Sequence, residues 1–181
     1  PSQVVFNGDL FDFAKPTLDE IKAAQSAFDQ LHKEGISTII MAGNHEAVSK
    51  TDSTFDYIPF RNINHVKFDN KLQIESTTLT LCDWHHIKFL QYAEPSNILI
   101  SHYRSTLPPH IYEEIDTRFV SKFKLVLLGD IHNRFSPEDH VHYTSSPYDT
   151  HYTKSRQDRG FIMLSIDGEG FEWEYITTDL P

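Results

Sequence analysis

The stretch QVVFNGDLFD, residues 3–12, joins a short apolar run to a glycine and two carboxylates. The run Gln3 to Phe6 is rich in valine, as buried strands are, and predicts a strand that delivers Asp9 to the loop beyond it. Three later segments also follow apolar runs: Gly43-Asn44-His45-Glu46 after 38–42, Ser101-His102 after 97–100, and Gly129-Asp130-Ile131-His132 after 124–128. Because open α/β folds carry their chemistry at the carboxyl ends of strands, we expect these side chains to converge at the carboxyl edge of a sheet.

The residue types in these four segments are those of a metal site. Manganese and magnesium favour carboxylate and carbonyl oxygens, whereas imidazole suits the mid-row transition metals. A mixed set of aspartate, asparagine and histidine therefore predicts a metal-dependent hydrolase.

The remaining chain alternates between strand and helix patterns, which predicts an α/β fold. After Pro16, Thr17 can cap a helix with Glu20 as its capping-box partner, and Gly35 ends that helix. Residues 51–70 have no clear period and predict a loop or short helix that leads into a strand. A further strand is expected at 79–83, and a β-hairpin at 161–166 and 171–176.

Together the segments resemble the calcineurin-like metallophosphoesterases, and within them the SbcD-type nuclease subunits of DNA double-strand-break repair. Residues 8–12 resemble the G-D-L-F-D of that branch, and residues 43–46 resemble its G-N-H-[DE]. Ser145-Ser146-Pro147-Tyr148, followed by Asp158-Arg159-Gly160-Phe161, is similar to its G-S-P-Y…[KR]-G-F. The resemblance runs from about Val4 to about Ile166. It implies a metallophosphoesterase-like β-sandwich flanked by helices, in a single nuclease domain over residues 1–181.

The chain departs from this pattern in two places. No D-x-H motif precedes Gly8, so we expect the domain to lack its first strand, either because the polypeptide is truncated at its N-terminus or because those ligands come from elsewhere. Asp130 stands where the pattern has the first histidine of G-H-x-H, and we interpret it as a ligand swap toward a harder metal. Residues 127–134 also resemble the first motif, which would make the chain a circular permutant, but the tail at 145–148 argues against this. We expect no capping or ATPase-binding domain.

The resemblance also assigns roles to residues. Two divalent ions are implied, manganese being expected and magnesium the alternative, with Asp9 as the bridging ligand. Asn44, His102 and Asp130 would complete the second ion's shell, and His132 would serve the first. His45 matches a histidine that is not a ligand and acts in catalysis, where it stabilises the transition state or protonates the leaving oxygen. The implied reaction is phosphodiester hydrolysis in DNA, and the implied partners are an SbcC-like coiled-coil ATPase and a second copy of the chain.

Other polar residues near these segments are interpreted as structural. His85 and His86 are neighbours on an expected strand and would face opposite ways, so they are not assigned as ligands. Asp12 is expected to make a structural bond. Arg104 is interpreted as a solvated basic residue rather than a phosphate contact. Tyr148 either stacks near substrate or packs.

Composition places the chain among soluble globular domains, with 39% hydrophobic and 23% charged residues and no membrane-spanning run. The single cysteine, Cys82, rules out an internal disulfide and suits a reducing cytoplasm. The net charge of −10 opposes duplex binding, which draws on Lys and Arg, so we expect weak DNA affinity from this chain alone. Two other functions remain open: a general phosphodiesterase or phosphatase of the same superfamily, and a non-catalytic module that docks the ATPase.

Overall fold

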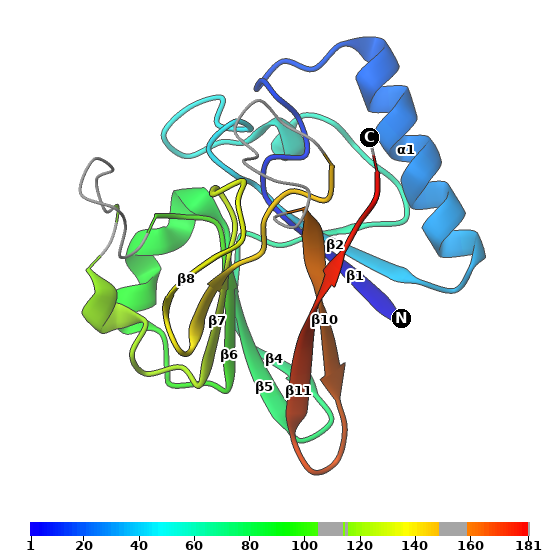
Figure 1. Cartoon of the computed structure of the whole chain (residues 1–181). Helices are drawn as coiled ribbons and strands as arrows, with labels where there is room; N and C mark the ends of the chain where they lie inside the picture. The colour runs from blue at the N-terminus through cyan, green and yellow to red at the C-terminus, as the bar shows by residue number, and fades with distance from the viewer. Residues whose placement is uncertain (105–113, 115, 149–158, 181) are drawn as a thin grey trace.

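A computed structural model describes residues 1–104, 114, 116–148 and 159–180 of the chain (Figure 1). The strands are β1 Gln3–Asn7, β2 Ser37–Met41, β3 Asn64–His65, β4 Phe68–Ile74, β5 Thr77–Cys82, β6 Ile98–Ser101, β7 Leu125–Leu128, β8 Phe135–Glu138, β9 Val141–Tyr143, β10 Gly160–Ile166 and β11 Phe171–Thr177. The α-helix α1 spans Leu18–Lys33, and the 3₁₀ helices η1, η2 and η3 span Thr54–Asp56, Trp84–Tyr92 and Thr117–Phe119. Asp158, quoted above for the resemblance, lies outside the described residues.

The strands form two main sheets and a hairpin. One sheet has the order β1-β2-β3 with parallel pairing, and the other has the order β4-β5-β6-β7-β9-β8. Within the larger sheet β5, β6, β7 and β9 are parallel, while β4 and β8 pair antiparallel at the two edges. Strands β10 and β11 pair antiparallel with each other, as the hairpin pattern predicts.

Alternation of side chains along the strands makes a layered core. In β2, Ile39 and Met41 face the larger sheet, whereas Ile40 packs toward Phe28 of α1. In β7, Leu125 and Leu127 meet the smaller sheet. The opposite face of β7, formed by Val126 and Leu128, packs against η2 through Ile87 and Leu90. The layers therefore run α1, small sheet, large sheet, η2, a mixed α/β sandwich with helices outside that is compatible with a metallophosphoesterase fold (Figure 1).

The helix α1 forms as its sequence signals predict. Thr17 is the N-cap, its hydroxyl accepts from the Glu20 N–H at 3.3 Å, and a Glu20 carboxylate oxygen accepts from the Thr17 N–H at 2.6 Å. After the C-cap, Gly35 has a φ of +73°, which favours glycine and ends the helix. The helix buries Phe28 edge-on against Phe6 and Phe60, with ring centroids 5.8 and 5.3 Å apart. This contact ties α1 to β1.

The structure corrects the sequence interpretation at two points in the fold. His85 and His86 lie in the 3₁₀ helix η2 and not on a strand, because the strand β5 ends at Cys82 and Asp83 caps η2 by accepting the His86 N–H. The antiparallel pair β8 and β9 was not expected. Its strands have 4 and 3 residues, which is too short for a visible period in the sequence.

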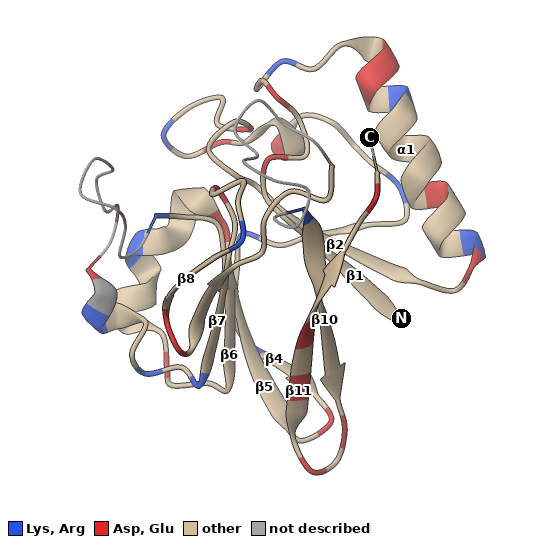
Figure 2. Ribbon diagram, in the orientation of Figure 1, with Lys and Arg blue, Asp and Glu red and all other residues tan. Residues whose placement is uncertain are grey.

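Charged side chains are unevenly distributed over the fold. Figure 2 shows acidic residues at both ends of α1 and along the β10–β11 hairpin, with lysines and arginines scattered over loops and helix ends. In the described part of the chain, no helix has the length and apolar character needed to cross a membrane.

Candidate metal centre

Four strand ends bring polar side chains to one place. Asp9 follows β1 and Asn44 follows β2, both in the small sheet, while His102 follows β6 and Asp130 follows β7 in the large sheet. The convergence therefore occurs between the carboxyl ends of two sheets rather than at the edge of one. The contact between the sheets is direct, since the Asn7 side-chain amide donates to the Leu127 carbonyl at 3.4 Å.

Asp9, His102 and Asp130 each offer one ligand atom, and these atoms lie within 4.8 Å of one another. We call these residues the three-residue group. His102 Nε2 lies 3.2 Å from Asp9 Oδ2 and 3.1 Å from the Asn44 side-chain oxygen. The amide oxygen of Asn44 thus lies beside the group, and two carboxylates, an imidazole and an amide share one small volume.

The His102 ring is held in place by a hydrogen bond on the side away from Asp9. Its Nδ1 lies 2.6 Å from the Asn7 carbonyl oxygen and donates to it, and the side chain is 1% exposed. With Nδ1 engaged in this way, Nε2 is the nitrogen that faces the carboxylates. A metal-binding histidine is usually oriented by such a bond to a carbonyl.

Glycines permit the close approach of the four segments. A Cβ at Gly129 would lie 2.4 Å from both the Asn7 carbonyl oxygen and His102 Nδ1, and a Cβ at Gly43 would lie 2.1 Å from Asp9 Oδ1. Asp9 and Asp130 themselves have φ angles of +52° and +76°. Such angles cost non-glycine residues of order 1 kcal/mol, and they cluster at functional sites.

Glu46 is a buried residue of the centre whose role was not inferred from the sequence. Its carboxylate accepts the backbone N–H groups of Asp9 at 2.9 Å, Phe11 at 2.8 Å and Gly43 at 2.8 Å, and it is 0% exposed. These bonds tie the loop after β1 to the loop after β2. The sequence signal was its place as the last residue of the segment that resembles G-N-H-[DE].

His45 lies at the rim of the centre. Its backbone N–H donates to Asp9 Oδ1 at 3.1 Å, and its ring Nδ1 lies 2.8 Å from the Asp12 carbonyl oxygen. The ring is 39% exposed. Asp12 therefore makes a structural contact to His45, mainly through its backbone.

His132 is not a member of the three-residue group. Its carbonyl accepts from the Ser146 N–H at 3.4 Å and from the Ser145 hydroxyl at 3.2 Å. Two separate parts of the sequence resemblance, the segments at 129–132 and 145–148, therefore meet in the fold. Tyr148 is 52% exposed.

Arg104 is ion-paired and only partly exposed, and not the unpaired solvated residue that the sequence suggested. Its Nε lies 3.2 Å from Asp130 Oδ2, and its Nη2 lies 3.3 Å from Glu114 Oε1. The sequence interpretation was wrong because neither acidic partner is adjacent to Arg104 in the chain.

The electrostatics of the group are strongly coupled. Burial disfavours the His102 imidazolium, but the hydrogen bond and the charge of Asp9 outweigh it and raise the pKa of His102 to about 9. Burial also acts against the Asp9 carboxylate, yet the contact with His102 lowers the pKa of Asp9. Burial raises the pKa of Asp130, with His102 and Arg104 opposing the shift. The His102 proton thus supplies positive charge between two carboxylates.

The donor set fits a divalent cation. Carboxylate and amide oxygens suit manganese or magnesium, and the imidazole nitrogen adds a preference for a transition ion. Asp9, His102 and Asp130 could each supply one ligand atom within one small volume, and among the described residues they make the one such group.

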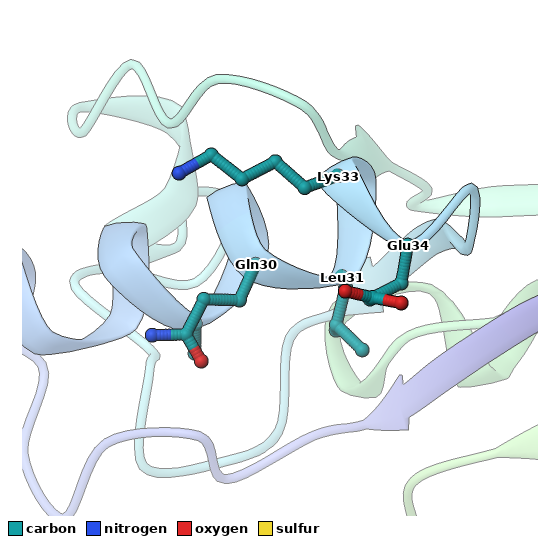
Figure 3. A pocket seen from close by; sticks show the side chains of 5 residues that line it. Gln30, Leu31, Lys33 and Glu34 are labelled. Atoms are coloured by element: carbon teal, nitrogen blue, oxygen red, sulfur yellow. The ribbon is translucent and has the colours of Figure 1, made fainter.

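A separate hollow lies along the last turns of α1, lined by Ala27, Gln30, Leu31, Lys33 and Glu34 (Figure 3). None of these residues contributes to the three-residue group, and the hollow offers only single charges of opposite sign. It has no place in the chemistry of the centre.

The layered fold and this donor set are compatible with a metallophosphoesterase. Comparison with known proteins is more specific. No protein-family model matches the chain. The chain is 24% identical to the probable exonuclease subunit 1 of Escherichia phage T5, over 98% of this chain and 56% of that protein. It is 21% identical to the SbcD component of the nuclease SbcCD of Staphylococcus saprophyticus, over 97% of this chain and 58% of that protein.

A third match covers fewer residues but has a higher sequence identity. The DNA double-strand break repair protein Mre11 of Methanocaldococcus jannaschii is 41% identical over 46 residues, which are 25% of this chain and 13% of that protein. These relatives confirm the resemblance to SbcD- and Mre11-type nucleases. The chain spans somewhat over half the length of the first two relatives.

Proposed function

We propose that this chain is the nuclease domain of an SbcD-type protein and hydrolyses phosphodiester bonds in DNA with a divalent metal ion. The observation that carries the proposal is the meeting of Asp9, His102 and Asp130 where strands of the two sheets end. Similarity to two nuclease subunits along almost the whole chain supports it.

The three-residue group, with Asn44 beside it, would hold the ion. Manganese is the proposed metal and magnesium the alternative, because an imidazole is present among the oxygen donors. A bound ion supplies Lewis-acid polarisation of a phosphoryl oxygen and lowers the pKa of water. The chain's own residues orient the ligands: Asn7 holds the His102 ring, and Glu46 holds the loop that carries Asp9.

His45 is the proposed proton donor to the leaving oxygen. Its backbone N–H is bonded to Asp9 and its Nδ1 to the Asp12 carbonyl, which fixes the ring next to the centre while leaving it 39% exposed. A general acid needs this combination of fixed orientation and access to substrate. Nε2 would be the nitrogen that transfers the proton.

A second ion, with His132 as a ligand, remains a proposal. It would need ligands from a strand that carries the D-x-H motif, upstream of β1. The strand β1 lies at the edge of its sheet in the described residues, so its open side would accept such a partner. That residues 1–181 form a single nuclease domain also remains a proposal.

The proposed partners are DNA, an SbcC-like ATPase and a second copy of the chain. The relatives' names support the first two. The net charge of −10 predicts that DNA affinity depends strongly on the ATPase partner and on bound cations.

The test is cleavage of a linear duplex DNA with manganese, compared between the wild type, Asp9→Asn and Asp19→Asn. Asp19 is an exposed aspartate of α1 paired with Lys22, and its variant is the matched control. The proposal expects cleavage by the wild type and by Asp19→Asn, and loss of at least ~100-fold in Asp9→Asn, as for other groups that stabilise transition-state charge. Cleavage by Asp9→Asn at the wild-type rate would contradict it.

The acidic charge favours one other function, a phosphodiesterase that acts on small substrates. Hydrolysis of an aryl phosphodiester without any cleavage of duplex DNA would select that function.

A further inference from the structure

Arg104 lies beside the candidate metal centre and is partly exposed. Its Nε is 3.2 Å from Asp130 Oδ2, which places the guanidinium next to a proposed metal ligand. The side chain is 34% exposed, whereas His102 behind the centre is 1% exposed. Although it is ion-paired with Asp130, the buried Nε makes no hydrogen bond of good geometry in the described structure. The Arg104 side chain is therefore partly exposed, while its Nε is buried against Asp130.

The position of Arg104 is set by Glu114. The Glu114 carboxylate accepts the Arg104 backbone N–H at 2.9 Å and contacts Nη2 at 3.3 Å, and the Glu114 N–H donates to the Arg104 carbonyl at 2.9 Å. The indole of Trp84 donates to the same carboxylate at 3.1 Å. The guanidinium is thus held at a fixed place rather than left free to sample solvent.

Trp84, which binds Glu114, also binds the segment that precedes the Asn44 loop. The Trp84 backbone N–H donates to the Ala42 carbonyl at 2.9 Å, directly before the loop of Gly43 and Asn44. Trp84, Glu114 and Arg104 therefore form a connected series of hydrogen bonds that starts at the Asn44 loop and ends in the ion pair between Arg104 and Asp130. Such a series fixes the distance between the guanidinium and the ligands on both sheets.

The acidic residues of the centre determine whether the Arg104 guanidinium can bind an anionic substrate. The carboxyl groups of Asp9 and Asp130 lie close together and that of Glu46 binds the Asp9 backbone, so together they disfavour an anionic substrate, with His102 offsetting part of their charge. Without a metal, Arg104 is shared between Asp130 and Glu114, and two carboxylates outweigh its single charge. A divalent ion on Asp130 would take up that carboxylate's charge, so that the guanidinium could pair with a new anion. Guanidinium groups bind phosphate with two parallel donors, which a lysine cannot do.

We propose that Arg104 contacts the substrate's phosphate in the metal-loaded centre and that its affinity for phosphate depends on the metal. This inference rests on the proposed function, because it requires a divalent ion at the three-residue group. It names the anionic phosphate of a nucleotide as the group that Arg104 binds. The coupling is reciprocal, so a bound nucleotide also tightens metal binding.

The experiment is calorimetric titration of thymidine 5′-monophosphate into the wild type, Arg104→Met and Arg61→Met, with and without saturating manganese. Arg61 is an exposed arginine paired with Asp29 at 3.4 Å and serves as the matched control. We expect manganese to tighten nucleotide binding in the wild type and in Arg61→Met. In Arg104→Met at saturating manganese, the affinity should fall about 10- to 100-fold, the range for a lost charge-assisted hydrogen bond.

Manganese affinity, measured first in each protein, separates this role from a structural one. If Arg104 only positions Asp130, Arg104→Met would change manganese affinity and leave nucleotide affinity at saturation equal to that of the wild type, which would overturn the inference. Absence of manganese binding to the wild type would overturn the proposed function and the inference together. If Arg104→Met does not fold, Arg104→Lys gives the same comparison: a smaller loss of nucleotide affinity is expected, and no loss would overturn the inference.

Discussion

The Nδ1 atom of His102 lies 2.6 Å from the carbonyl oxygen of Asn7, the residue that ends β1. One hydrogen bond thus joins the end of the small sheet to the end of the large sheet. It also points Nε2 of His102 at Asp9 and Asn44. The packing of the sandwich and the orientation of the proposed metal ligand are set by the same contact.

The protonation of His102 predicts a pH dependence of the metal-free protein. Its pKa is about 9 in the folded chain, against an ordinary value of 6.5, so the contact with Asp9 stabilises the fold fully below about pH 6.5 and is lost as the pH rises through about 9. We expect the Tm of the metal-free wild type to fall over this window, and the fall to be much smaller in His102→Gln. Thermal unfolding in a chelator at a series of pH values measures it, and equal slopes for the two proteins would contradict it.

The raised pKa of His102 also predicts how metal binding depends on pH. An ion on Nε2 must displace the proton that His102 carries below about pH 9. Manganese affinity should therefore rise as the pH increases from about 7 toward 9, with proton release on binding. Titrations in two buffers of different ionisation enthalpy measure the released protons, and an affinity that does not change with pH would argue against His102 as a ligand.

Glu46 is expected to be a structural requirement of the centre. Glu46→Gln replaces one of two acceptor oxygens by a donor that faces backbone N–H groups, and it should destabilise the fold by about 2–3 kcal/mol. Glu172→Gln on the exposed part of β11 is the control and should change little. Urea denaturation midpoints give both values. A Glu46→Gln variant as stable as the control would show that these three bonds contribute little.

A substitution at Gly129 tests whether metal binding needs the close approach of this residue to Asn7 and His102. In Gly129→Ala the new methyl group would collide with the Asn7 carbonyl and the His102 ring, whereas Gly168→Ala in the β10–β11 turn meets nothing within 4 Å. We expect Gly129→Ala to lose manganese binding and Gly168→Ala to keep it. Retention of wild-type affinity in Gly129→Ala would mean that the four segments do not meet as closely as described.

Much of the fold follows from local patterns in the sequence. The apolar runs before Asp9, Asn44, His102 and Asp130 are strands within one or two residues of their expected bounds, and Thr17 and Gly35 delimit α1. These features depend on nearby residues, so a single sequence contains them. The hairpin of β10 and β11 is a further local feature, since Asp167 and Gly170 close its turn.

The parts that could not be predicted depend on contacts between distant segments. That β1 and β2 belong to a different sheet from β6 and β7 has no local signal. Arg104 was interpreted as solvated because Glu114 and Asp130 lie 10 and 26 positions away in the sequence. Glu46 is the last residue of the segment that resembles G-N-H-[DE], but its role is visible only where three backbone N–H groups converge on it. The roles of all six site residues remain predictions: Asp9, Asn44, His45, His102, Asp130 and His132.

The central claim is that Asp9, His102 and Asp130 bind a divalent ion, and manganese titration by calorimetry tests it most directly. The proteins to compare are the wild type, His102→Ala and, as a control, His32→Ala, which alters an exposed histidine in the last turn of α1. The account predicts one equivalent at this centre in the wild type and in His32→Ala, and its loss in His102→Ala. No manganese binding by the wild type, or wild-type affinity in His102→Ala, would contradict it.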